Sequence, residues 1–146
     1  MRPAEPFARP VPAAADLVRE VRSEADVLAA RHLVRAAAIA AGFDLVGQTK
    51  IVTAANEMAR NAYVHGGGGT MVVRELVGTC GRRGLRLEVT DRGPGILDVE
   101  AALADGFSTG AGLGHGLGGT RGLVHEFGID TAAGAGTTVT VVRWRA

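Results

Sequence analysis

The N-terminal half of the chain shows two patterns of hydrophobic and polar positions. Residues 16–22 interleave charged and apolar side chains, which is typical of a half-buried edge strand. Ser23 stands three positions before Asp26, an arrangement that caps a helix start, and it predicts a helix to about residue 41. A second helix is predicted over residues 45–65, before a run of glycines.

One side of each predicted helix is apolar, so we expect both helices to pack on a common core. The first stripe consists of Val27, Leu28, Val34, Ala38 and Ala41, and the second of Ile51, Ala54, Ala55, Met58, Ala62 and Tyr63.

The C-terminal half begins with two segments rich in β-branched residues, 70–77 and 85–90, and the glycines between them predict a hairpin. Short helices are predicted over 98–104 and 117–127, and a last strand of alternating character over 137–144. These elements predict an α+β fold, a two-layer sandwich of a mixed, mostly antiparallel sheet with helices on one face.

Composition narrows the class of protein. The chain has 146 residues, of which 47% are hydrophobic, enough for a single domain with a real core, which we place at residues 15–146. Residues 1–14 contain four of the five prolines and are expected to form a flexible tail. The formal net charge of +1, without a long block of one sign, gives no indication of nucleic-acid or membrane binding. With a single cysteine, Cys80, and no leader or apolar span, the sequence favours a cytoplasmic protein.

Glycine is the unusual residue. It occurs 22 times, and ten of these glycines lie between Gly93 and Gly122. Three clusters of possible chemistry fall in or before this stretch.

The first cluster is Glu57-Met-Ala-Arg-Asn61 in the second predicted helix. Glu57 and Asn61 share a helix face, where a carboxylate can accept a proton and an amide oxygen can bind magnesium. Taken alone, the pair is more typical of a solvated helix surface than of a site.

The second cluster, Asp91-Arg-Gly-Pro-Gly95, directly follows an apolar strand. Its glycines allow a flat ligand to approach, and Asp91 can accept a hydrogen bond from an exocyclic amine. An ordinary turn has the same composition.

The third cluster is the glycine-rich segment from Gly106 to Gly119. Gly112, Gly114 and Gly116 precede a predicted helix, and backbone amides in such a segment favour phosphate. The segment contains a G-x-G-x-x-G string, but it lies too late in the chain for a dinucleotide-binding unit, and no Gly-Lys-Ser/Thr exists for a P-loop.

Taken in order, these three motifs and Gly136-Thr137 at the last strand resemble the Bergerat ATP-binding fold of gyrase, histidine kinases and MutL. Within that superfamily the chain resembles the small anti-sigma regulatory kinases, the RsbT-type serine/threonine kinases of the stressosome first and the RsbW-like anti-sigma factors next. The resemblance extends from about Asp16 to Arg145.

The resemblance implies an ATP-binding kinase domain that uses Mg²⁺, and it assigns roles by position. Glu57 would be the general base, Asn61 would bind magnesium, and Asp91 would accept from the adenine amine, helped by Thr137 through a water. The remaining implied contacts are the backbone at Gly93 and Gly95, a lid that begins at Ser108 and Thr109, and its hinge and floor at Gly112, Gly114 and Gly116. Arg60 and Arg121 are further phosphate candidates.

The implied function is transfer of the ATP γ-phosphate to Ser or Thr of a STAS-domain antagonist protein in a partner-switching pathway. Two alternatives stay open: an anti-sigma factor that sequesters a sigma subunit, and an ATP-gated activator of a PP2C-type phosphatase.

Overall fold

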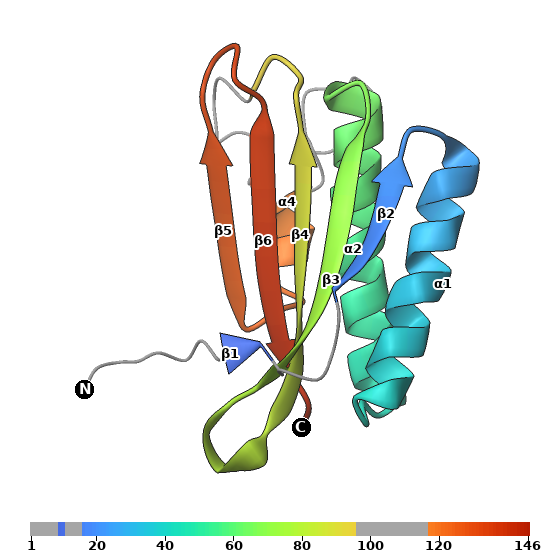
Figure 1. The fold of residues 1–146 in the computed structure, drawn as a ribbon, viewed down its shortest axis with the longest axis vertical. Helices are drawn as coiled ribbons and strands as arrows, with labels where there is room; N and C mark the ends of the chain where they lie inside the picture. The colour runs from blue at the N-terminus through green and yellow to red at the C-terminus, as the bar shows by residue number, and fades with distance from the viewer. Residues whose placement is uncertain (1–8, 11–15, 96–116) are drawn as a thin grey trace.

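The computed structural model describes residues 9–10, 16–95 and 117–146 (Figure 1). In these residues a six-stranded sheet has the order β1-β3-β4-β6-β5, with β2 also paired to β3. Every described pairing is antiparallel. The strands are β1 Arg9–Pro10, β2 Leu17–Val21, β3 Gly69–Val77, β4 Arg83–Asp91, β5 Glu126–Thr131 and β6 Thr137–Trp144.

Two long helices, α1 Glu24–Ala40 and α2 Leu45–His65, lie side by side and pack on the sheet (Figure 1). Both starts are capped by side chains, which satisfy backbone amides that have no partner inside the helix. Ser23 Oγ accepts a hydrogen bond from the Asp26 amide at 3.1 Å, and Asp44 Oδ1 accepts one from the Gly47 amide at 2.8 Å. The predicted α+β fold with a mostly antiparallel sheet is confirmed.

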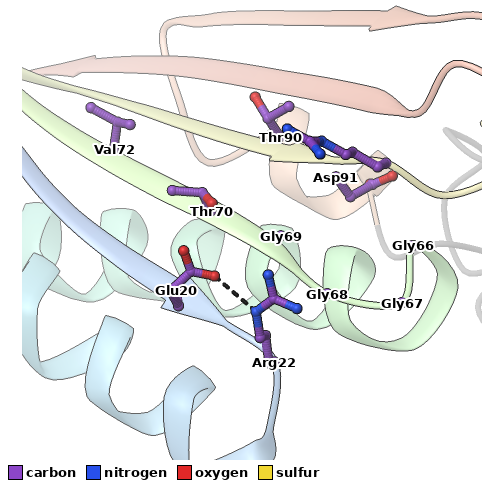
Figure 2. A pocket seen from close by; sticks show the side chains of 11 residues that line it. Glu20, Arg22, Gly66, Gly67, Gly68, Gly69, Thr70, Val72, Thr90 and Asp91 are labelled. Carbon is purple, nitrogen blue, oxygen red and sulfur yellow. Dashed lines mark hydrogen bonds and ion pairs between the residues drawn. The ribbon is translucent and has the colours of Figure 1, made fainter.

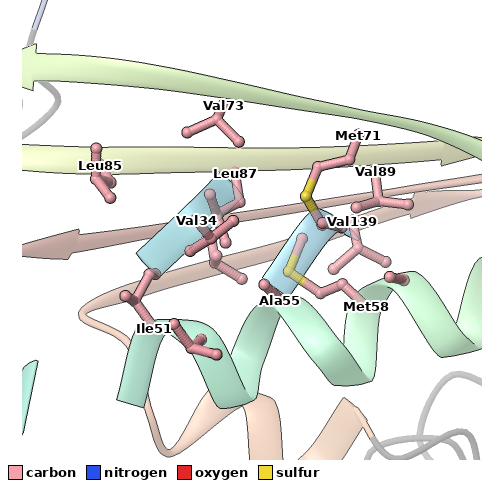
Figure 3. Packing of buried hydrophobic residues seen from close by; sticks show 14 of the residues in the cluster. Val34, Ile51, Ala55, Met58, Met71, Val73, Leu85, Leu87, Val89 and Val139 are labelled. Carbon is pink, nitrogen blue, oxygen red and sulfur yellow. The ribbon is translucent and has the colours of Figure 1, made fainter. Parts of the chain in front are cut away.

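The core lies between the helices and one face of the sheet (Figure 3). Alternate residues of β3, β4 and β6 point into it, as the two-residue period of a strand requires. The central strand and helix side chains are Met71, Val73, Leu85, Leu87, Val89, Val139 and Val141 from the sheet and Val34, Ile51, Ala55 and Met58 from the helices. The other sheet face, here called the open face, carries Thr70, Arg86, Glu88, Thr90, Thr138 and Thr140.

Three details differ from the sequence prediction. The helix predicted over 117–127 is wrong beyond its first residues: α4 spans only Leu117–Arg121, and the chain then enters β5, which was not predicted. Leu28 is 45% exposed, so it lies outside the apolar stripe of α1. Tyr63 is only half-buried.

Two further predictions concern residues 98–104 and the N-terminal tail. The helix predicted over 98–104 lies outside the described residues. Within the expected tail, Arg9 and Pro10 pair with Val77 and Leu76 as the short strand β1.

None of the described helices is both long and apolar enough to cross a membrane.

Candidate functional site

Asp91 ends β4 and is the buried carboxylate around which the candidate site is built; only 6% of it is exposed. In the sheet register it lies between Gly69 of β3 and Thr137 of β6. Its Oδ1 accepts a hydrogen bond from the Gly93 amide at 2.8 Å, whereas Oδ2 has no partner among the described residues. A carboxylate oxygen without a protein partner is suited to an amine-bearing ligand, because it can accept a hydrogen bond from the amine.

Two glycines allow the backbone to close around Asp91. A Cβ at Gly66, the C-cap of α2, would overlap the Asp91 side chain. A Cβ at Gly136 would overlap the Asp91 carbonyl oxygen, and Gly136 also has a φ of +83°, which L-residues rarely adopt. The end of α2 and the start of β6 therefore meet at Asp91 because both positions lack side chains.

The predicted contacts at Gly93 and Gly95 are also close backbone approaches. A Cβ on Gly93 would lie 2.6 Å from the Gly66 Cα atom. Gly95 has a φ of +83° and packs against the carbonyl of Ala132, and the Pro94 carbonyl accepts a hydrogen bond from Gly134 at 2.9 Å. The turn after β4 is thus fixed against the turn between β5 and β6.

Thr137 is 4% exposed, and its hydroxyl lies 2.9 Å from that of Thr131, its cross-strand partner on β5. Thr131 Oγ1 also donates to the Gly136 carbonyl at 3.1 Å. A hydroxyl has one proton, so in this arrangement Thr137 donates to Thr131 and keeps lone pairs to accept from a ligand or water. Gly66, Asp91, Gly93, Thr131, Gly136 and Thr137 are together called the Asp91 corner below.

Thr131 and Gly66 were missed from the sequence. Thr131 ends β5, a strand that was not predicted, and Gly66 was interpreted only as part of a glycine run that ends a helix. The run of four glycines after an E-x-x-x-N helix was the one signal that could have indicated Gly66.

Glu57 and Asn61 lie one turn apart on α2, whose C-cap contacts Asp91. Asn61 is only 5% exposed, and Glu57 is half-buried. Glu57 precedes Gly66 by nine residues, roughly 13 Å along a helix axis at 1.5 Å per residue. The structure thus places a carboxylate and an amide along one element that ends at the Asp91 corner, a separation suited to an extended nucleotide.

Comparison with known proteins agrees with this geometry. The sequence model described as "Histidine kinase-like ATPase domain" matches residues 11–143. The chain belongs to the histidine kinase-like ATPase domain family. It is 42% identical over 124 residues to the "Serine/threonine-protein kinase RsbT" of Bacillus subtilis (strain 168), an alignment that covers 85% of this chain and 92% of that protein.

Among solved structures, the chain is similar in fold to "The crystal structure of the RsbU and RsbW domains of Rv1364c from Mycobacterium tuberculosis". The TM-score is 0.62 at 23% identity, and the match covers 91% of this chain and 34% of that one. The predicted resemblance to the RsbT-type kinases and their ATPase superfamily is confirmed.

The histidine kinase-like ATPase domain offers one described candidate ligand for magnesium, the Asn61 amide oxygen. Among the residues that the structure describes, no three His, Cys, Asp or Glu side chains gather into a metal-binding group. Mg²⁺ typically takes one or two protein oxygens and completes its shell with phosphate and water. The residues present therefore fit a metal that is held mainly by the nucleotide.

The lid residues Ser108, Thr109, Gly112, Gly114 and Gly116 lie outside the described residues. Their predicted roles stay predictions.

Arg60 and Arg121 were predicted as candidates for phosphate binding, and Arg60 instead binds an acidic side chain. Its Nη1 donates to both carboxylate oxygens of Glu24 on α1, at 2.8 and 3.1 Å. Arg60 is thus held by α1 as an interhelical ion pair. Arg121 is exposed at the end of α4.

A cavity of about 720 Å³ adjoins the Asp91 corner (Figure 2). Its lining consists of Glu20, Arg22, Gly66, Gly67, Gly68, Gly69, Thr70, Val72, Thr90, Asp91 and Arg92. Glu57, Asn61 and Thr137 do not line it, and Thr70 and Thr90 belong to the open face. This cavity is therefore distinct from the surface along α2 that carries the predicted catalytic residue.

Proposed function

We propose that this protein is an ATP-dependent serine/threonine kinase that phosphorylates a STAS-domain antagonist in a partner-switching pathway. The Asp91 corner carries the proposal, because it joins a buried carboxylate acceptor to the helix that bears Glu57 and Asn61. The 42% identity to a protein named as a serine/threonine kinase supports the same function. Residues 15–146 would form the kinase domain, and residues 1–14 would form a flexible tail apart from the short strand β1. The protein would act in the cytoplasm as part of a stressosome.

In the proposed complex the adenine amino group donates to Asp91, and the Thr137 hydroxyl accepts from a water at the ring. Gly93 and Gly95 leave room for the purine beside the backbone. The phosphates extend along α2 toward Glu57, and the glycine lid covers them. Bound Mg²⁺, held by the Asn61 oxygen and the phosphates, would neutralise phosphate charge.

The proposed reaction is an in-line displacement at the γ-phosphorus. The substrate hydroxyl oxygen forms a bond to phosphorus, the bond to the β–γ bridging oxygen breaks, and ADP leaves. Glu57 orients the attacking hydroxyl and accepts its proton. Phosphoryl transfer asks mainly for positioning and charge stabilisation, so one carboxylate on a rigid helix is sufficient for this role.

The test is a phosphotransfer assay with Mg-ATP and the STAS-domain protein encoded nearest to this gene. Loss of a general base costs about 10²–10⁴-fold, so Glu57→Gln should reduce transfer by at least 100-fold while ATP affinity stays within a few-fold. Glu88→Gln, the same change on the open face, is the matched control. Transfer by Glu57→Gln at the wild-type rate would eliminate the general-base role. Retention of a sigma factor without phosphorylation of any STAS-domain protein would instead favour the anti-sigma function.

A further inference from the structure

A groove of about 310 Å³ runs between α1 and α2, outside the candidate site. The two helices lie side by side (Figure 1). The groove is lined by Arg31 and Arg35 of α1 and by Thr49, Val52, Thr53 and Asn56 of α2. These six residues are called the α1–α2 groove.

The two arginines lie one turn apart and have no acidic partner in the described part of the chain. The same two helices do form an ion pair where an acid is present, because Arg60 binds Glu24 at 2.8 Å. In the groove, α2 offers hydroxyl and amide groups opposite the arginines and no carboxylate. Both threonine hydroxyls donate to backbone carbonyls of their own helix, Thr49 to Leu45 and Thr53 to Thr49.

The surrounding segment is also positive. Residues 27–53 contain Arg31, Arg35 and Lys50 against the single acid Asp44, three basic residues and one acidic residue, so the local charge is +2. Asp44 is already engaged as the N-cap of α2. An anionic group in the groove would therefore meet no competing carboxylate.

Exposed apolar residues continue the groove toward the turn between the helices. Ile39 lies one turn after Arg35 and is 57% exposed, and Leu45 and Val46 at the start of α2 are 72% and 59% exposed. A group of exposed apolar residues beside charged ones is typical of a protein interface. This combination favours a protein segment with carboxylates and apolar side chains over a small anion.

The groove also leads to Glu57. Thr53 is one helical turn before Glu57, and Asn56 immediately precedes it, so the polar surface of α2 is continuous between them. A protein seated in the groove would place its neighbouring residues beside the proposed general base.

We propose that the α1–α2 groove is the docking site for an acidic segment of the protein substrate, whose carboxylates bind Arg31 and Arg35 and whose apolar residues cover Ile39, Leu45 and Val46. This proposal rests on the proposed kinase function, since it assigns the substrate contact outside the nucleotide site. None of the residues proposed to contact ATP lines the groove.

The experiment compares the double variant Arg31→Glu/Arg35→Glu with Arg19→Glu/Arg86→Glu, which changes the net charge equally on two strands. The probe is the STAS-domain protein of the phosphotransfer assay, in the unphosphorylated form. For the groove variant we expect KM for this protein to rise at least tenfold, with kcat and the ATP Kd within twofold of wild type. The control variant should keep the wild-type KM, and Arg31→Gln/Arg35→Gln should give a smaller rise if charge reversal prevents folding.

Direct binding of the STAS-domain protein without ATP separates the possible failures. Binding that depends on Arg31 and Arg35 without phosphorylation would support the groove and overturn the kinase function. Phosphorylation with equal KM in both double variants would overturn the proposed docking site in the α1–α2 groove and leave the kinase function standing. Absence of both binding and phosphorylation would overturn both proposals.

Discussion

The hydrophobic core and the Asp91 corner are built in opposite ways. Under the sheet, Met58, Met71 and Leu87 are fully buried, and the helices are held there by side chains that fill space. At Asp91 the elements are held by missing side chains, because Gly66 and Gly136 allow α2 and β6 to reach the same carboxylate. The core can thus lose packing without moving the site, whereas one added methyl group at the corner must displace a residue of the site.

The two regions also differ in whether they contain polar groups without a hydrogen-bond partner. The core is apolar and complete, and its stability comes from burial. The Asp91 corner contains buried polar groups, of which Asp91 Oδ2 has no partner among the described residues. A free carboxylate oxygen can accept a hydrogen bond from a ligand, and a ligand that binds only the folded state stabilises it. This difference is the physical basis for treating the corner as a binding site.

The largest expected effect on stability is in the core. Leu87→Ala should lower the free energy of unfolding by about 2–5 kcal/mol, because it removes a fully buried side chain and leaves a cavity. Chemical denaturation measures this loss. At a temperature where the variant stays folded, its ATP Kd should match wild type within twofold. A large loss of ATP affinity would show that core and corner are not separable.

A smaller loss of stability, with a larger effect on the site, is expected at Gly136. Gly136→Ala should cost about 2–3 kcal/mol, since alanine must both adopt a positive φ and displace the Asp91 carbonyl. ATP affinity should fall at least tenfold. Gly134→Ala is the matched control, because Gly134 has a φ of +77° in open space and should cost only about 1 kcal/mol, with ATP affinity unchanged. Equal ATP affinity in the two variants would contradict the role of the close approach.

The smallest effect is expected at the other end of β6, remote from the corner. His125 Nδ1 accepts a hydrogen bond from the Trp144 amide at 2.9 Å. Burial, with Arg143, Arg82 and Lys50 nearby, lowers the pKa of His125 from its ordinary 6.5. The folded state therefore disfavours protonation of His125. Neutral His125 contributes fully to the free energy of unfolding above about pH 6.5, and this contribution is lost as the pH falls below that value.

Wild-type stability should accordingly decrease by up to about 1 kcal/mol between pH 7.5 and 5.5 from this group. His125→Asn can keep an acceptor near the Trp144 amide but does not titrate, so its stability should depend less on pH over this range. Thermal unfolding at each pH measures the difference. An identical pH dependence in both proteins would show that His125 is not responsible.

Local patterns predicted most of the fold. The caps at Ser23 and Asp44 and the alternation in β3, β4 and β6 are signals within a few residues, and the sequence shows them directly. Strand β5 was missed because Glu126-Phe-Gly-Ile-Asp-Thr131 contains a glycine and is paired on one side only, with β6. Its identity as a strand depends on register with a distant segment.

The site was predictable in part for the same reason. Glu57, Asn61 and Asp91 stand in motifs that can be recognised in order along the chain. Gly66 and Thr131 become part of the site only through contacts with residues distant in sequence, Asp91 and Gly136 among them. Spacing along a sequence does not reveal such approaches.

The most direct test of the central claim is calorimetric titration of ATP into wild type and Asp91→Asn. The asparagine keeps an oxygen for the Gly93 amide, so the turn should persist, while the charged acceptor is lost. A hydrogen bond to a charged group contributes about 1.5–3 kcal/mol, which corresponds to a Kd raised roughly 10- to 100-fold. Asp130→Asn on β5, which is separated from β4 by β6, is the control and should bind ATP as wild type does. Equal ATP affinity in wild type and Asp91→Asn would contradict the assignment of the Asp91 corner as the adenine site.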